Sequence, residues 1–218
     1  MTSMTSPLTT PLSAFATTLA IVRCGGVPVF CDTDEHGLID FGEAREALRA
    51  MPGIRFFVPV HLYGFPVDPA GLRLLIDEFR LICVEDCAQS IGAGTAGEAT
   101  GLSGVAAATS FYPTKNLGAI GDAGAFVTNN ELHAAHAQRL RNYGQSQRYH
   151  HPETGMNSRL DELQAALLRV RLSVLAQFTE RRRSIADRCL AGMRNAQVEL
   201  MAPPVDRENH VYHLFVVR

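Results

Sequence analysis

Residues 68–86 read DPAGLRLLIDEFRLICVED, a helical pattern followed at once by a short apolar run that ends in two carboxylates. The spacing of apolar residues from Asp68 to Phe79 is typical of an amphipathic helix. Leu81 to Glu85 is short and continuously apolar up to its last residue, which indicates a strand buried on both faces. The stretch therefore predicts one helix–strand unit of an α/β fold.

The same alternation extends toward the N-terminus. Strands that alternate with helices in this way are typically parallel, joined by crossover helices that cover both faces of the sheet. We therefore predict the α/β class, with a mostly parallel central sheet and helices on both faces. Right-handed crossovers would place the strand ends, and a site, along one edge of the sheet. The predicted elements are a helix over Ser13 to Arg23, a strand over Val27 to Cys31, a helix over Asp40 to Arg49 and a strand over Arg55 to Val60.

The pattern changes toward the C-terminus. Short strands are predicted around Ala108 to Phe111 and Ala123 to Thr128, then a helix over Asn130 to Arg141, a polar loop over Asn142 to Asn157 and a long helical pattern over Ser158 to Leu190. Val198 to Met201 and His210 to Val217 predict strands of another unit. We expect a first domain over residues 1–192 that includes the long helix. Residues 193–218 would begin a small C-terminal domain that is incomplete, because the chain stops inside its second strand.

Composition restricts the classes of function. With 218 residues, 46% hydrophobic content and a net charge of -2, the chain predicts a soluble globular protein without a basic face for nucleic acid. Its five cysteines form no CxxC pair, which argues against a zinc ribbon or a secreted disulfide framework. No secretory leader pattern is present, and no apolar run reaches the ~18 residues of a membrane span. We expect a cytoplasmic protein with no membrane partner.

Lys115 is the only lysine in the chain, and the other cations are arginine. An amine can lose its proton and condense with a carbonyl group, whereas a guanidinium cannot. Taken alone, a single lysine is as consistent with chance as with function. It lies between a short predicted strand and a glycine turn, from which its side chain could reach back over the edge of the sheet.

Other residue types around Lys115 match the needs of pyridoxal phosphate (PLP) chemistry. That chemistry needs a lysine, a carboxylate to keep the pyridine nitrogen protonated, donors for the phosphate and a flat contact for the ring. Asp86 directly follows a predicted strand, where the strand end would direct it into a crevice, and Gln89 lies three residues on. Candidates for each need are therefore present.

Five ordered segments make the signal specific. In them the chain resembles the DegT-type sugar aminotransferases of the fold-type I aspartate aminotransferase superfamily, and the similarity runs from about Leu12 to near the end of the chain. The segments are PVHLYGFPVD (59–68), VEDCAQSIGA (84–93), SFYPTKNLGAIGDAGAFVTN (110–129), RNYGQ (141–145) and GMNSRLDELQAALLRVRL (155–172).

The resemblance implies the cofactor PLP and a set of roles. Lys115 matches the lysine that forms the Schiff base, and Asp86 matches the partner of the pyridinium, so these two are the expected catalytic residues. The resemblance also implies a homodimer with shared active sites, because one cofactor ligand comes from the neighbouring subunit. The other expected cofactor-binding residues are Gln89 for the phenolic oxygen, Ser110 for the phosphate, Phe15 for stacking on the ring and Asn157 for the phosphate of the neighbouring subunit.

The implied reaction moves an amino group from a donor such as L-glutamate to a keto-sugar nucleotide. The chain also departs from the family pattern. A glycine–threonine turn that would cradle the phosphate upstream is missing, and the C-terminal domain is short, so the resemblance predicts a chain truncated at both ends. The alternative function is therefore a catalytically weak or inactive remnant that acts through dimerisation or interaction.

Two other interpretations of these residues are less consistent with the sequence. Gly92 to Gly97 matches G-x-G-x-x-G, but in a dinucleotide fold these glycines open a helix directly after the first strand, and here Asp86 and Gln89 intervene. Taken singly, the candidate residues also favour structural roles, such as a helix cap for Asp86 or Asn157 and a strand hydroxyl for Ser110. Only their ordered occurrence together favours the active site.

Overall fold

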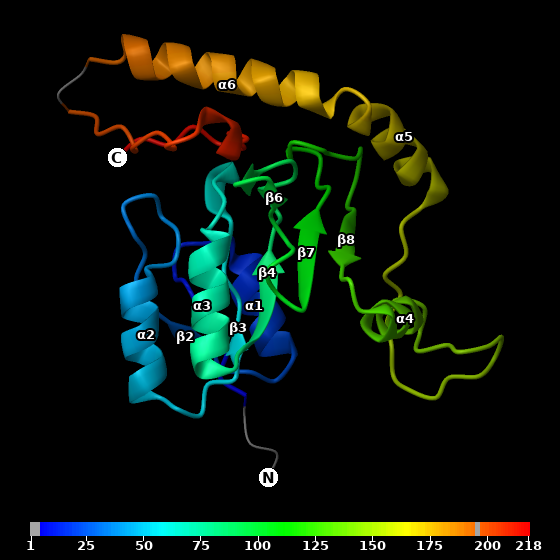
Figure 1. Ribbon diagram of the computed structural model, residues 1–218. Helices are drawn as coiled ribbons and strands as arrows, with labels where there is room; N and C mark the ends of the chain where they lie inside the picture. Colours follow the sequence, from blue (N-terminus) through cyan, green and yellow to red (C-terminus); the bar gives the residue numbers. More distant parts are fainter. Residues whose placement is uncertain (1–4, 195–196) are drawn as a thin grey trace.

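The computed structural model describes residues 5–194 and 197–218. Its centre is a six-stranded sheet in the order β2-β1-β3-β4-β7-β8, in which only β8 runs antiparallel to its neighbour (Figure 1). A short hairpin, β5 with β6, lies outside it. The α/β class with a mostly parallel sheet is thereby confirmed. The strands are β1 (Leu8–Thr9), β2 (Val29–Phe30), β3 (Phe56–Phe57), β4 (Ile82–Asp86), β5 (Gly94–Thr95), β6 (Glu98–Ala99), β7 (Ala106–Ser110) and β8 (Gly124–Val127).

Helices lie on both faces of this sheet. Figure 1 shows α2 and α3 in front of the strands and α1 behind them. Asp40 caps α2 and Asp68 caps α3, since each carboxylate accepts two N–H groups of the first turn that have no partner inside the helix. The helices are α1 (Phe15–Arg23), α2 (Phe41–Ala50), α3 (Pro69–Phe79), α4 (Glu131–Leu140), α5 (Glu162–Leu172) and α6 (Leu175–Gly192), with 3₁₀ turns η1 (Leu62–Gly64) and η2 (Arg207–Asn209).

The main core lies between the sheet and helices α2 and α3. Leu8, Phe57 and Cys83 contribute to it from three neighbouring strands, and all three are 0–1% exposed. Burying a side chain of the size of leucine or phenylalanine stabilises the fold by about 1.5–3 kcal/mol. A smaller cluster around Leu117 and Leu168 packs α5 against the loop that follows Lys115. The core therefore fixes the strand ends, and the small cluster fixes the lysine loop.

Two predictions about the C-terminal third are wrong. The long helix predicted over Ser158 to Leu190 is two helices, α5 and α6, with a break at Ser173 and Val174. The two predicted C-terminal strands do not form. Within residues 198–217 the only β-structure is the isolated bridge between Leu200 and Val217. No helix among the described residues is long and apolar enough to cross a membrane.

Candidate active site

Strands β4 and β7 end side by side and bring two predicted residues to one cavity. Asp86 is the last residue of β4 and pairs with Ala108 of β7, which ends two residues later at Ser110. Asp86 and Ser110 both line a cavity of about 610 Å³ between α1 and the sheet. The remaining walls are mostly apolar side chains of α1 and of strands β3 and β4, among them Ala20, Ile21, Phe57 and Val84.

The Asp86 carboxylate is held by one hydrogen bond at each oxygen. Thr17 of α1 donates its hydroxyl to Oδ2 at 2.7 Å, and the backbone N–H of Ala88 donates to Oδ1 at 3.0 Å. Both groups act as donors, so the two bonds fix the orientation of the carboxylate. The sequence analysis missed Thr17, whose signal was only a polar residue on the buried face of a predicted helix.

Lys115 approaches Asp86 from the loop after β7. Its backbone N–H closes a turn onto the carbonyl of Tyr112 at 2.8 Å, and its side chain is half-buried. Burial lowers the pKa of the Lys115 amine below its ordinary value, and the negative charge of Asp86 opposes that shift. The two predicted catalytic residues are thus close enough to interact, although Lys115 is not among the described residues that line the cavity.

Gln89 and Ser110 keep hydrogen-bonding capacity for a bound group. Gln89 uses its side-chain oxygen to accept the N–H of Tyr63 at 2.6 Å, so its amide nitrogen has no partner in the described part of the chain. Ser110 accepts the N–H of Tyr112 at 3.2 Å, which leaves the hydroxyl proton free to donate. Both side chains can therefore serve as donors at the ends of β4 and β7.

Phe15 and Asn157 are not brought to this cavity. Phe15 begins α1 and is 73% exposed, and residues two apart on a helix point about 200° apart, so with Thr17 toward Asp86 it faces elsewhere. Asn157 is exposed and forms a β-bridge with Asn142, after the end of α4. Neither lines the cavity among the residues that the structure describes. Their predicted roles stay predictions.

A buried polar cluster supports the site from the other face of β4. Glu85 accepts hydrogen bonds from Nε2 of His61 at 2.9 Å and from the backbone N–H groups of Gly101, Ser103 and Gly104. Burial alone would raise the pKa of Glu85, but the bonds from His61 and the backbone lower it overall.

The same cluster resembles a metal site in composition, because Cys87 lies within 4.8 Å of the ligand atoms of His61 and Glu85. Its chemistry argues otherwise. Nδ1 of His61 accepts the N–H of Val67, so Nε2 carries the proton and neither nitrogen offers a lone pair. Burial raises the pKa of the Cys87 thiol to about 12, whereas a metal binds the thiolate. The cluster is therefore a structural hydrogen-bond network that holds the end of β4 in place.

Comparisons with known proteins agree on one family. Residues 5–218 match the model of the DegT/DnrJ/EryC1/StrS aminotransferase family. A dTDP-3-amino-3,4,6-trideoxy-alpha-D-glucose transaminase of Micromonospora megalomicea subsp. nigra is 45% identical over 211 residues, which are 94% of this chain and 56% of that protein. This chain therefore spans about half the length of the curated relatives it matches.

Solved structures have the same fold. DesV of S. venezuelae in complex with a ketimine intermediate has a TM-score of 0.89 and 41% identity, and the match covers 98% of this chain and 57% of DesV. NtdA of Bacillus subtilis with bound cofactor PMP has a TM-score of 0.86 and 31% identity over 98% of this chain and 49% of NtdA.

Proposed function

Because this chain belongs to the DegT/DnrJ/EryC1/StrS aminotransferase family, we propose that it carries out PLP-dependent transfer of an amino group from a donor such as L-glutamate to a keto-sugar nucleotide. One observation carries the proposal. The only lysine of the chain is half-buried and interacts with a carboxylate that is fixed at the end of β4. The dTDP-sugar transaminase among the relatives supports the class of acceptor.

The residues present fit the cofactor, as judged by their donors and charges. Asp86 is an oriented carboxylate with lone pairs to spare, Lys115 is an amine with a lowered pKa, and Ser110 and Gln89 have donors to offer. PLP, when bound, supplies a cationic ring that stabilises negative charge on the substrate carbon. The solved relative that holds PMP supports the same cofactor.

Each residue then has a defined task. Asp86 holds the proton on the pyridine nitrogen, with its carboxylate kept in place by Thr17 and Ala88. Lys115 holds the cofactor through its amine and, once freed, takes the proton from Cα of the amino donor, for which a lowered pKa is suited. Ser110 donates to the phosphate and Gln89 to the phenolic oxygen.

We place these tasks in a cytoplasmic homodimer in which Asn157 of the partner subunit adds a further phosphate contact. Asn157 is exposed and is not among the described residues that line the cavity of its own chain, which supports that arrangement. Phe15 keeps its proposed role of stacking on the ring; it begins α1 two residues before Thr17, and its exposed side chain is free to contact a bound ring.

The test uses the single lysine. The purified chain is incubated with PLP, reduced with borohydride and digested, and we expect one labelled peptide, which contains Lys115. Lys115→Arg, which leaves the chain without lysine, is the matched control and should lose that label. Labelling at the N-terminal amine alone would contradict the assignment and favour the catalytically inactive, interacting protein.

A further inference from the structure

The C-terminal segment, residues 211–214, lies directly against the loops of the candidate site. Its backbone donates from Val211 to the carbonyl of Gly64 at 3.0 Å and from Leu214 to the carbonyl of Tyr63 at 3.2 Å. The backbone N–H of Tyr63 in turn donates to Gln89. Val211 is fully buried, and the segment thus forms part of the packing around the strand ends.

Asn116, the residue after Lys115, joins this segment to the lysine loop. Its side chain is buried, and its Nδ2 donates to the carbonyl of Val211 at 2.9 Å. Its Oδ1 lies 3.1 Å from Nδ1 of His213. Because Nδ2 is committed as a donor, Oδ1 is the acceptor and Nδ1 of His213 carries the proton. One carboxamide therefore fixes both the segment and the tautomer of His213.

The charges around the segment agree with this neutral tautomer. Burial first, and then the positive charges of Lys115 and Arg182, together lower the pKa of His213 to about 4. Arg182 of α6 donates to the carbonyls of Tyr212 and His213 from the other side. At neutral pH His213 is uncharged and adds no positive charge beside Lys115. Asp86, Arg182 and His213 are the charged or titratable groups that these contacts place near the lysine.

We propose that Asn116 and His213 form a positioning pair for Lys115, which clamps residues 211–214 onto the lysine loop and so keeps the amine half-buried beside Asp86. Neither residue is a catalytic group. The importance of the pair for transamination rests on the proposed function, whereas the clamp itself is a property of this chain that is measurable without cofactor.

The experiment uses the single lysine again, in the full chain. Reductive methylation with ¹³C-formaldehyde gives one dimethyl-lysine NMR signal, from Lys115, besides that of the N-terminus, and its pH titration gives the pKa of Lys115. In Asn116→Ala the segment loses both side-chain contacts, so water reaches the loop. We expect the Lys115 pKa to rise toward its ordinary value, because burial is what lowers it. The matched control is Asn129→Ala, which removes an exposed asparagine without a hydrogen bond in the described part of the chain and should leave the pKa unchanged.

A second pair of variants keeps the test decisive if Asn116→Ala does not fold. His213→Leu removes the donor to Oδ1 and should raise the Lys115 pKa in the same direction. His213→Asn returns an N–H near the position of Nδ1 and should restore the wild-type value. If folded Asn116→Ala or His213→Leu shows the wild-type pKa, the proposal is overturned. Equal losses of Tm in both His213 variants without a pKa difference would show a merely structural role and would overturn it too.

The outcomes also separate this inference from the proposed function. A raised pKa in the variants together with absent PLP labelling of wild-type Lys115 would uphold the clamp and contradict the aminotransferase. Labelling of wild-type Lys115 by PLP, with no change of the Lys115 pKa in the variants, would support the aminotransferase and contradict the clamp.

Discussion

Glu85 and Asp86 are neighbours on β4 whose side chains leave the strand on opposite sides, as successive residues of a strand do. Asp86 meets α1 through Thr17, while Glu85 meets His61 and the loop after the β5–β6 hairpin. The Asp86 carboxylate accepts only two hydrogen bonds from the described residues and has lone pairs available near Lys115, whereas the Glu85 carboxylate accepts four hydrogen bonds. Two neighbouring carboxylates are therefore suited to different tasks: the proposed chemical task for Asp86 and a structural task for Glu85.

Asp86→Asn tests the chemical task. An amide cannot hold the pyridine nitrogen protonated, and it also places an N–H against one of the two donors that now meet the carboxylate. We expect borohydride labelling of Lys115 to persist while the half-reaction with L-glutamate, followed by cofactor absorbance, slows at least a hundredfold, about 3 kcal/mol in barrier. A variant that keeps the wild-type rate would show that Asp86 is not the partner of the ring nitrogen.

Glu85→Gln tests the structural task. The variant places an amide among four donors, and we expect it to lose about 3 kcal/mol of unfolding free energy at pH 7 in urea titrations. Because the pKa of Glu85 is lowered by folding, its stabilisation is present at neutral pH and is lost as the pH falls below the ordinary glutamate value of 4.5 and through the lowered pKa of the folded state. The difference between wild type and variant should therefore shrink in acid. Glu46→Gln, on an exposed and unpaired glutamate, should cost little at either pH.

At the scale of elements, the sequence predicted the helices and strands that show a clear hydrophobic pattern. It missed the elements that form only through tertiary contacts. Helices α2 and α3 and strands β4 and β7 lie where they were predicted. Strand β1 was missed although it is interior to the sheet, because two residues in a Ser/Thr/Pro-rich stretch have no apolar pattern. Thr9 is completely buried there only because its hydroxyl bonds to the carbonyl of Val58 in the native fold.

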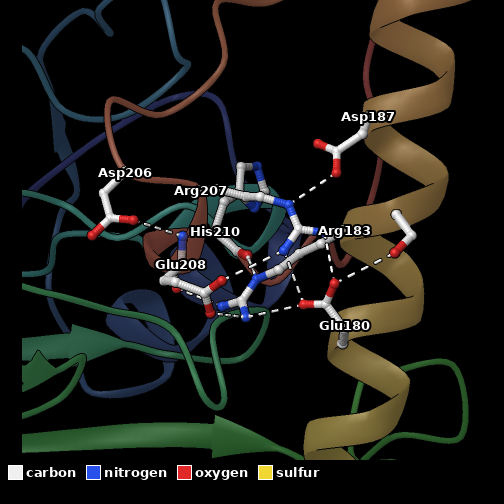
Figure 2. Close-up of polar contacts among 8 residues, drawn as sticks. Glu180, Arg183, Asp187, Asp206, Arg207, Glu208 and His210 are labelled. Carbon is white, nitrogen blue, oxygen red and sulfur yellow. Dashed lines mark hydrogen bonds and ion pairs between the residues drawn. The ribbon is translucent and has the colours of Figure 1, made fainter.

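The C-terminal segment failed as a pair of strands for a related reason. Its short apolar runs are typical of strands, but arginines of α6 bind its backbone instead of a neighbouring strand. Arg183 donates to the carbonyls of Glu208 and His210 and pairs with the carboxylate of Glu208 (Figure 2). Side-chain capture of this kind leaves no periodic signal in a sequence. The same holds for Thr17, the unpredicted contact of Asp86.

Arg183→Lys tests whether α6 holds this segment in place. Lysine keeps the positive charge but loses the planar fork that serves three acceptors at once, so we expect a local loss of about 2 kcal/mol. Amide hydrogen exchange over residues 207–214 should become about thirtyfold faster, with the β4 and β7 amides unchanged. Arg181→Lys, on an exposed arginine of the same helix, is the control, and equal effects in both variants would refute the specific contact.

The molecule as a whole leaves apolar surface uncovered at two places. A parallel sheet is normally covered on both faces, yet α1 shares its face with a cavity of about 610 Å³. Helices α5 and α6 extend across the top of the domain (Figure 1), and Leu163, Val170, Leu172 and Phe178 on them are each at least half exposed. Exposed large apolar side chains of this kind are typical of surfaces that contact another chain. This surface is adjacent in sequence to Asn157, which supports the proposed dimer.

Mixed dimers test whether two chains share each site. If Asn157 reaches the cofactor phosphate of the partner subunit, Asn157→Ala loses a charge-assisted hydrogen bond of about 1.5–3 kcal/mol and with it at least tenfold in PLP affinity. At a PLP concentration that labels wild-type Lys115, labelling of this variant should therefore be weak. Lys115→Ala cannot be labelled at all, but it still carries Asn157.

Equal amounts of the two variants, unfolded together and refolded, should place about half of the Asn157→Ala chains in mixed dimers. In each of these the lysine of one chain meets Asn157 of the other, so its labelling should rise toward about half the wild-type extent. The control is the double variant Lys115→Ala/Asn157→Ala, mixed with Asn157→Ala in the same way. It can form mixed dimers but has no Asn157 to offer, so the labelling of Lys115 should not rise. A rise with both partners would mean that dimerisation alone restores the site. Full labelling of Asn157→Ala by itself would remove Asn157 from the phosphate site, and with it the main reason for sharing sites between subunits.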